Sequence, residues 1–297
     1  MKNWKKMTAA ALAALALVGA LAGCGNNADK KVATKQATKI VTDLKGREVS
    51  VPQDVKRIAV VPIPWASVIY AIDGSSERLA AIHPGAMSAY KGKFLETKDK
   101  HFAQLDTKII AQNFSVNIES AAQAGIDTAI LWQYQDKDAE KLTKVGIPTL
   151  LIYNDTVENL KKSFLIIGKL LGKEERAAKI NRYYDATNEK IIAKKAWEKT
   201  DKPTVLFLRN AKLRLQGNDN FMHEALRIGG GNNPYGQING GSEQTIAMEE
   251  VYKLNPDIIL LSNFDKFVPD DLYDNKIPGQ DWSTVKAVKE KRVYKVP

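Results

Sequence analysis

Aromatic side chains follow two of the short apolar runs in this sequence, where their rings could hold a flat ligand. Trp132 and Tyr134 come after the run at 127–131, and Trp65 comes shortly after the run at 57–61. Large rings offer rigid faces for stacking at a low cost in conformational entropy. The alternative for Trp65 and for Trp132 is an ordinary place in the hydrophobic core.

Two arginines follow a third apolar run, at 204–208. Arg209 is the next residue, and Arg214 lies close behind it along the chain. The guanidinium group is a planar donor fork that suits carboxylate, phosphate or catecholate oxygens. Together with the aromatic residues, these arginines predict a ligand-binding site for a bulky, anionic and partly flat molecule.

Residues with catalytic chemistry are sparse. His83 follows the apolar run at 78–82 and could contact the ligand, although a lone histidine is more often structural. The sequence has no His-Glu-x-x-His, Cys-x-x-Cys or Gly-x-Ser-x-Gly motif. The glycine-rich stretch at 229–234 lacks the Lys-Ser/Thr pair of a phosphate-binding loop. We therefore predict that the protein is not an enzyme and has no catalytic residue, resident metal or cofactor.

The elements that position these residues are strands ending at one edge of a sheet. The apolar runs above, with further runs at 148–152 and 257–261, alternate with helical segments. This order predicts an α/β fold with largely parallel strands, covered on both faces. In open α/β sheets, ligands bind beyond the carboxyl ends of the strands, where the residues above are placed.

Two adjacent helices are predicted in the middle of the chain. Asp155 would cap the first, with Glu158 completing a capping box, and Gly172 would end it. The second would run from about 173 to 199, a stretch without Gly or Pro. About 26 residues make a helix of roughly 39 Å, longer than is usual in a compact domain. We interpret it as a rod that joins two lobes; the alternative is a solvated helix on a single domain.

The first residues predict a secretory signal. Basic residues at 2, 5 and 6 precede an apolar run shorter than the roughly 20 residues that span a bilayer. The run ends in Leu21-Ala22-Gly23-Cys24, which resembles a bacterial lipobox and holds the only cysteine of the chain. The resemblance implies cleavage before Cys24 and a lipid on its sulfur. The alternative is a short apolar segment that stays attached as a membrane anchor.

The composition excludes several classes of protein. The chain has 297 residues, of which 44% are hydrophobic and 26% charged, as in globular proteins. Wholly disordered, collagen-like and polytopic membrane proteins are therefore excluded. The net charge of +10 is dispersed and contains no run of five basic residues, so we predict no nucleic acid partner. A single cysteine excludes a disulfide framework.

These features divide the chain into five segments. The second segment has few bulky apolar residues and cannot bury enough surface to become ordered, so it reads as a tether. The segments are a signal peptide at 1–23, a lipidated tether at 24–38, an N-terminal α/β lobe at 39–154, helices including the inter-lobe helix at 155–200, and a C-terminal α/β lobe at 201–297.

Several motifs, in their order and spacing, resemble the substrate-binding lipoproteins of ABC importers for ferric siderophores, haem and cobalamin. The resemblance covers nearly all of 40–297. It implies two Rossmann-like lobes linked by a single long α-helix, the helical-backbone type of periplasmic binding protein. In that family a final helix follows the terminal strand; this chain stops at Pro297, so we expect a shortened or incomplete second lobe. The motifs are Asp43-Leu44-Lys45-Gly46-Arg47, Asn117-Ile118-Glu119, Gly146-Ile147-Pro148, Asn255-Pro256-Asp257 and Arg292-Val293-Tyr294.

The resemblance also implies a function. Such a lipoprotein captures a metal chelate between its lobes and delivers it to a membrane permease with its ATPase. Each lobe carries a surface glutamate that pairs with permease arginines, here Glu119 and Glu249, with Glu250 as the alternative to the latter. We expect a monomer, lipid-anchored on the outer face of the bacterial cytoplasmic membrane. The predicted cargo is an iron–siderophore-type chelate; the alternative is haem, cobalamin or a nickel or molybdate species.

Two other classes of function are less well supported by the sequence. A lipid-anchored hydrolase would require turnover of ester or phosphate substrates by the purified protein. A surface adhesin, suggested by the basic charge, would require salt-insensitive binding to host-type polymers.

Overall fold

The computed structural model describes residues 37–215, 221–235, 244–263 and 265–296. The predicted signal peptide, Cys24 and nearly all of the predicted tether lie outside these residues. Within the described ranges, no helix combines the length and apolar character needed to cross a membrane.

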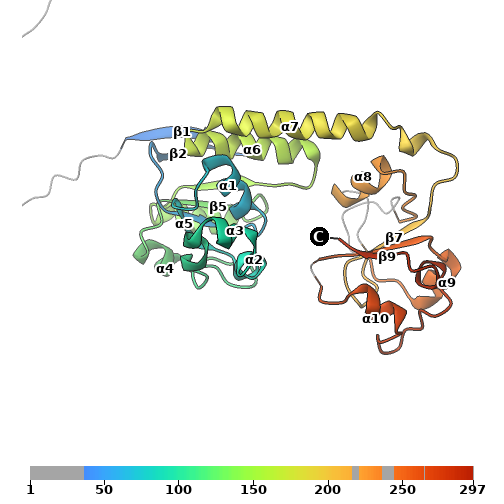
Figure 1. Cartoon of the computed structure of the whole chain (residues 1–297). Coiled ribbons are helices and arrows are strands. Elements are labelled where there is room, and N and C mark those ends of the chain that lie inside the picture. The colour runs from blue at the N-terminus through green and yellow to red at the C-terminus, as the bar shows by residue number, and fades with distance from the viewer. Residues whose placement is uncertain (1–36, 216–220, 236–243, 264, 297) are drawn as a thin grey trace, which may run out of the picture. The chain divides into compact units, whose positions relative to one another are not determined.

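The first sheet has four parallel strands in the order β4-β3-β5-β6. All four were predicted, and Figure 1 labels one of them, β5, among the N-terminal helices. Neighbouring residues of β5 face two separate hydrophobic clusters, since Ile130 packs in one and Leu131 in the other. The sheet is therefore covered on both faces, as predicted. Its strands are β3 (Ile58–Val60), β4 (Leu79–Ile82), β5 (Thr128–Trp132) and β6 (Thr149–Ile152).

Short helices connect these strands. Their bounds are α1 (Trp65–Asp73), α2 (Pro84–Tyr90), α3 (Phe94–Lys98), a 3-10 helix η1 (Lys100–Gln104), α4 (Ile118–Gln123) and α5 (Asp136–Lys144).

A second sheet holds three parallel strands in the order β7-β8-β9. Its core includes Trp282, which is fully buried and donates from Nε1 to Oε1 of Gln280 (3.0 Å). The two sheets together confirm the predicted α/β class. The strands are β7 (Val205–Leu208), β8 (Ile258–Leu261) and β9 (Val293–Lys295), and the helices are α8 (Phe221–Ile228), α9 (Met248–Leu254), α10 (Pro269–Tyr273) and α11 (Lys286–Lys289).

The two sheets use the same local device to start a central strand. Before β5, a carboxylate oxygen of Asp127 accepts hydrogen bonds from the backbone N–H groups of Lys56 (2.6 Å) and Arg57 (3.1 Å), ahead of β3. Before β8, Asp257 accepts from the N–H of Thr204 (2.8 Å), ahead of β7. Each aspartate thus fastens the start of its own strand to the start of the neighbouring strand.

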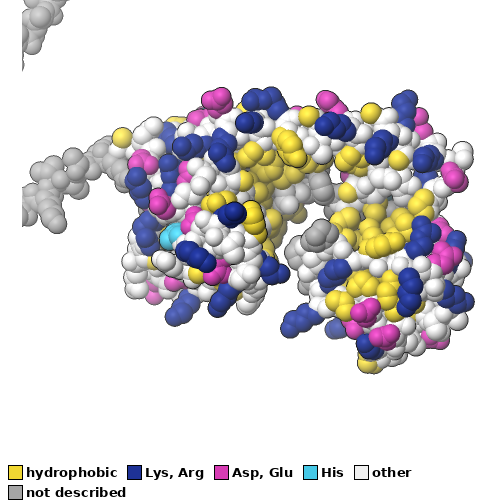
Figure 2. All heavy atoms as spheres, in the orientation of Figure 1, with side chains coloured by type: hydrophobic (Ala, Val, Ile, Leu, Met, Phe, Trp, Pro, Cys, Tyr) yellow, Lys and Arg dark blue, Asp and Glu magenta, His cyan; other side chains and the backbone are white. Residues whose placement is uncertain are grey.

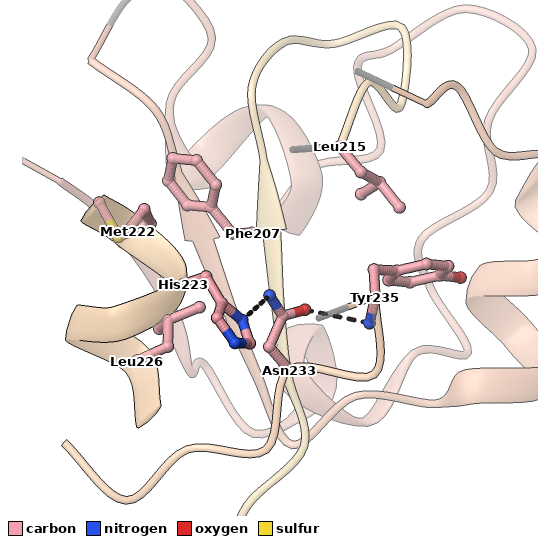
Figure 3. A pocket seen from close by; sticks show the side chains of 7 residues that line it. All are labelled: Phe207, Leu215, Met222, His223, Leu226, Asn233 and Tyr235. Carbon is pink, nitrogen blue, oxygen red and sulfur yellow. Dashed lines mark hydrogen bonds between the residues drawn. The ribbon is translucent and has the colours of Figure 1, made fainter. Parts of the chain in front are cut away.

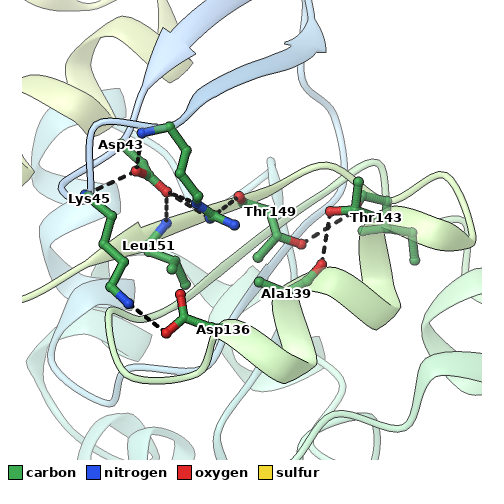
Figure 4. A network of polar contacts seen from close by, with 9 residues as sticks. Asp43, Lys45, Asp136, Ala139, Thr143, Thr149 and Leu151 are labelled. Carbon is green, nitrogen blue, oxygen red and sulfur yellow. Dashed lines mark hydrogen bonds and ion pairs between the residues drawn. The ribbon is translucent and has the colours of Figure 1, made fainter.

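A hairpin of β1 (Thr38–Thr42) and β2 (Glu48–Pro52) is fastened to the edge strand β6 by one buried carboxylate (Figure 4). Asp43, in the turn, accepts hydrogen bonds from the N–H groups of Lys45 and Arg47 and from Arg47 Nε (2.8 Å). It also accepts from the N–H of Leu151 in β6 (3.2 Å). Arg47 in turn donates to the carbonyl of Thr149 (3.0 Å). The hairpin therefore covers an otherwise open sheet edge.

The two predicted middle helices are α6 (Val157–Leu171) and α7 (Glu174–Ile192), which lie side by side in Figure 1. Gly172 ends α6 as predicted, in the left-handed conformation (φ 65°) that glycine adopts without strain. The N-cap is Thr156, whose side chain accepts from the N–H of Asn159, and not Asp155 as predicted. Asp155 instead accepts from the N–H of Thr156.

The second helix is shorter than predicted. α7 has 19 residues, about 28 Å, and ends at Ile192 rather than near 199. Lys195 adopts a left-handed conformation (φ 50°), and a short 3-10 helix η2 (Ala196–Glu198) follows. In η2 the Trp197 ring lies 5.5 Å from the Arg227 guanidinium of α8. Packing against α8 thus overrides the local helical preference.

The packing of α6 on α7 is unusually close at one point. A Cβ atom added to Gly168 would lie 2.5 Å from Cβ of Ala177, so only glycine permits this approach. Further along, Asn181 donates to the carbonyl of Lys161 (3.1 Å), and Lys161 Nζ pairs with Asp185 (2.6 Å). The two helices form an antiparallel hairpin joined by contacts that extend along α7 as far as Asp185.

Candidate functional site

Three aromatic rings gather at the carboxyl ends of β5 and β6. Trp132 stacks on Tyr134 with ring centroids 6.3 Å apart and an interplanar angle of 13°. Tyr153 meets both edge-on, at 5.8 Å from Trp132 and 6.1 Å from Tyr134. We call these three residues the aromatic cluster. Two of its members were predicted from the sequence, and the structure brings them together at the expected edge of the sheet.

The side-chain amide of Gln135 connects the aromatic cluster to the loop at Phe114. Gln135 Oε1 accepts from the backbone N–H of Trp132 (3.1 Å), and its Nε2 donates to the carbonyl of Phe114 (3.0 Å). Tyr134 remains 62% exposed, which leaves much of this side chain accessible to a ligand. Partial burial of its hydroxyl, and secondarily Tyr153, raises the pKa of Tyr134, so this phenol stays neutral at physiological pH.

Tyr153 was missed by the sequence analysis. It is the residue that directly follows β6 (Thr149–Ile152). The strand itself was predicted at 148–152, so the same reading of strand ends would have found this residue.

Trp65 lies in the hydrophobic core of the first sheet. Its side chain is 1% exposed, and its ring packs against Phe164 of α6 with centroids 5.6 Å apart. In this conformation the ring presents no face to a ligand, in agreement with the core alternative. The indole Nε1 is buried without a hydrogen-bond partner among the residues described.

His83 is also buried, at 2% exposure, and both of its ring nitrogens are engaged. Nδ1 accepts from the N–H of Gly85 (2.9 Å) and caps α2, which assigns the proton to Nε2, facing the carbonyl of Gln112 at 3.3 Å. The ring stacks on Phe114 at 4.3 Å. These contacts agree with the structural alternative for His83 and leave no nitrogen for a metal.

The burial of His83 predicts a pH dependence of stability. Burial lowers the pKa of His83, and the contact with Gln112 only partly opposes this. The unfolded chain therefore binds a proton at His83 more readily than the folded chain does. The contribution of neutral His83 to the free energy of unfolding is thus present above about pH 6.5 and is lost as the pH falls below it. We expect His83→Asn, which can still cap α2, to lose less urea stability between pH 7.5 and 5 than the wild type. Equal losses in the two proteins would contradict this assignment.

Arg209 and Arg214 lie together at the carboxyl end of β7. The backbone N–H of Arg209 donates to the carbonyl of Arg214 (2.8 Å) across a tight turn. Within the turn, Leu213 adopts a left-handed conformation (φ 59°) and its side chain is buried. Arg209 is partly exposed and Arg214 exposed. The prediction that both arginines stand at a strand end is met by their backbone positions.

A small cavity lies beside β7 and α8 (Figure 3). His223 contacts the side-chain amide of Asn233 (3.2 Å), whose Oδ1 accepts from the N–H of Tyr235 (3.1 Å). Its volume of about 10 Å³ is enough for one water molecule and far too small for a metal chelate. The lining residues are Phe207, Leu215, Met222, His223, Leu226, Asn233 and Tyr235.

The two glutamates expected at docking surfaces occupy equivalent places. Glu119 is the second residue of α4 and Glu249 the second residue of α9, and both are exposed. Each stands eight positions before the aspartate that starts the central strand, Asp127 or Asp257. By this spacing, Glu249 and not Glu250 occupies the position in the second half of the chain that corresponds to Glu119.

Glu250 has another local role. Its carboxylate accepts from the backbone N–H of Ala247 at the N-cap of α9 (3.3 Å). A side chain that caps its own helix is less available to a partner than its neighbour, which further separates Glu250 from Glu249.

The arrangement of charged and metal-ligating side chains among the described residues bears on two further kinds of site. In the described ranges, no group of three or more His, Cys, Asp or Glu side chains is arranged to hold a metal ion. On the face shown in Figure 2, lysine and arginine side chains are scattered among acidic ones rather than gathered. This dispersed charge gives no support for a nucleic acid partner.

Comparison with known proteins identifies the family. The family model described as "Periplasmic binding protein" matches residues 115–297, and the chain belongs to this family. A periplasmic solute-binding protein from Veillonella parvula is 39% identical with a TM-score of 0.80, covering 88% of this chain and 79% of that one. In Bacillus subtilis, an uncharacterized ABC transporter substrate-binding lipoprotein is 25% identical (93% and 85% covered) and an iron-uptake system-binding protein is 27% identical (94% and 87% covered). The protein is thus a substrate-binding component of an ABC transporter, a class that acts with a permease and an ATPase, and it is not an enzyme.

Proposed function

We propose that this protein captures an iron–siderophore-type metal chelate outside the cytoplasm and delivers it to its permease. The observation that carries the proposal is the aromatic cluster at the carboxyl ends of β5 and β6. A partly exposed surface of three rings suits a large ligand with flat or aromatic groups. The similarity to an iron-uptake system-binding protein supports iron as the metal in the chelate.

The aromatic and the basic residues would contact different parts of the chelate. Trp132, Tyr134 and Tyr153 would stack on the organic part of the chelate, while Arg209 and Arg214 would pair with its anionic oxygens. Trp65 and His83, both predicted as ligand contacts, are buried and would support the site from beneath. The proposed role is reversible binding, which requires neither a general base nor a nucleophile.

Other cargoes fit the same residues to different degrees. Haem and cobalamin offer broad rings that the aromatic cluster could also hold. A small oxyanion such as molybdate, or a compact nickel complex, would use the arginines but would leave three rings without a partner. The aromatic cluster therefore favours a larger chelate over the small ions.

We further propose lipid anchoring at Cys24 and docking through Glu119 and Glu249. The lipobox at Leu21-Ala22-Gly23-Cys24 supports the first proposal. The matched positions of the two glutamates on α4 and α9 support the second. Exposed charge pairs of this kind guide and orient docking more than they add affinity.

The binding proposal is tested by titration. Tryptophan quenching is recorded while a ferric tris-catecholate, a ferric hydroxamate, haem, cobalamin, molybdate and a nickel–histidine complex are added in parallel. We expect saturable binding of a ferric chelate and a loss of about fivefold to tenfold in affinity for Tyr134→Ala, from one lost stacking contact. Phe94→Ala serves as the control, since Phe94 is 69% exposed on α3, away from the cluster in sequence.

Two results would overturn the proposal. Molybdate or nickel–histidine binding with no ferric chelate binding would replace the proposed cargo. Equal affinities for Tyr134→Ala, Phe94→Ala and the wild type would remove the aromatic cluster from the site.

A further inference from the structure

An aromatic ring stands next to one of the two docking glutamates but not next to the other. Tyr252 follows Glu249 by three residues on α9, so the two side chains share one face of the helix. Tyr252 is 39% exposed, so part of its side chain is open to a partner. On α4, the residue three positions after Glu119 is Ala122.

The ring of Tyr252 is held in place by its hydroxyl. The Tyr252 hydroxyl donates to the backbone carbonyl of Asp281 (2.8 Å). The Asp281 carboxylate is itself occupied, accepting from the N–H and hydroxyl of Ser283 and from Asn275. Because the contact is to backbone in a braced turn, the ring has a fixed position and loses little entropy when a partner arrives.

The carboxylate of Glu249 is available beside this ring. Among the residues that the structure describes, Glu249 has no hydrogen-bond or ion-pair partner, and Lys253, one turn further on, does not pair with it. The neighbouring Glu250 is engaged at the N-cap of α9. The exposed start of α9 thus presents an anion and the face of a ring together.

We infer that Glu249 and Tyr252 form a receptor for one arginine side chain of the permease. The guanidinium would pair with the Glu249 carboxylate and lay its plane over the Tyr252 ring, which a lysine ammonium cannot do equally well. The inference rests on the proposed docking role of Glu249 and adds to it a discrimination between arginine and lysine. It also makes docking unequal, because Glu119 would pair with its arginine through charge alone.

The inference is tested with right-side-out membrane vesicles from the source cells. Binding of the fluorescently labelled protein to these vesicles is measured for the wild type, Tyr252→Phe, Tyr252→Leu, Glu249→Gln and Glu249→Gln with Tyr252→Leu. We expect Tyr252→Leu to bind about twofold to fivefold more weakly than the wild type. Tyr252→Phe keeps the ring but loses the hydroxyl bond to Asp281, so its affinity should fall between those two. The double variant should bind no more weakly than Glu249→Gln alone, because both side chains serve one arginine. Tyr183→Leu, at a ring 75% exposed on α7, is the control and should bind normally.

The outcomes separate this inference from the docking proposal. If Tyr252→Leu binds like the wild type while Glu249→Gln is weakened, the ring has no role and the docking proposal stands. If Glu249→Gln also binds like the wild type, both fail. Vesicles treated with butanedione, which modifies arginine, should lose the difference between the wild type and Tyr252→Leu; persistence of that difference would overturn the choice of arginine.

Discussion

Replacing Glu119 and Glu249 together by arginine should abolish uptake while leaving ligand affinity unchanged. Each substitution places a positive charge where the permease is expected to present arginines, so attraction at two points becomes repulsion. Like charges brought together at an interface oppose binding by several kcal/mol, which is enough to reduce complex formation by orders of magnitude. Ligand affinity is spared because neither glutamate belongs to the aromatic cluster or to the turn at Arg209.

The measurement pairs two assays on the same variant. Ligand affinity is measured by tryptophan quenching, and uptake by accumulation of the labelled chelate in cells whose own binding protein is replaced. Glu140→Arg with Glu290→Arg is the matched control, because it changes the net charge equally at exposed glutamates of α5 and of the loop before β9. Normal uptake by the Glu119/Glu249 variant would reject the docking assignment, and loss of uptake in the control would assign the effect to net charge.

Removing the buried carboxylate of Asp43 should destabilise the protein by about 3 kcal/mol. Its side chain is fully buried and accepts hydrogen bonds from two segments of the chain, the β1–β2 turn and Leu151 of β6. In Asp43→Ala these donors lose a charged acceptor, and Arg47 keeps only its bond to Thr149 inside the protein. The hairpin would then keep the backbone bond from the N–H of Leu44 to the carbonyl of Leu151 (3.0 Å) but would lose the buried carboxylate that ties its turn to β6.

Urea unfolding of Asp43→Ala and Asp136→Ala checks this expectation. Asp136 belongs to the same network in Figure 4, where it pairs with Lys45, but both of these side chains are more than one-third exposed. An exposed pair contributes at most about 1 kcal/mol, so Asp136→Ala should shift the midpoint only slightly. Similar shifts for the two variants would show that burial of Asp43 has no special energetic consequence.

The strands β3 to β8 were predictable because each is a short apolar run bounded by polar or turn residues, whereas β1, β2 and β9 mix polar and apolar residues and give no such signal. An aspartate also marks the start of β5 and of β8. Its carboxylate accepts hydrogen bonds from backbone N–H groups at the start of the adjacent strand. The end of α7 was not predictable from local sequence. No glycine or proline marks it, and the chain breaks at Lys195 because Trp197 packs on Arg227 of α8 and Ala196 lies against Gly230 just after that helix, some 30 residues further along.

The positions of the candidate residues along the chain were predictable, but their burial was not. The reading of strand ends locates Trp132 and Tyr134 at the end of β5 and Arg209 at the end of β7, yet it cannot tell an accessible ring from a buried one. Trp65 is covered by Phe164, nearly 100 residues away, and His83 meets the carbonyl of Gln112. Such burial depends on which distant segments fold over a residue, which local sequence does not record.

The close crossing of α6 and α7 has a mechanical consequence. Between the close contact of Gly168 with Ala177 and the ion pair of Lys161 with Asp185, the two helices are packed together. A packed pair resists bending far better than one helix alone. Among the described residues, no hydrogen bond or ion pair joins α6 to α7 beyond Asp185, and the last turns of α7 run into the left-handed break at Lys195. Thermal bending of this linker should therefore concentrate between residues 186 and 195, within a span of about ten residues, rather than spread along its length.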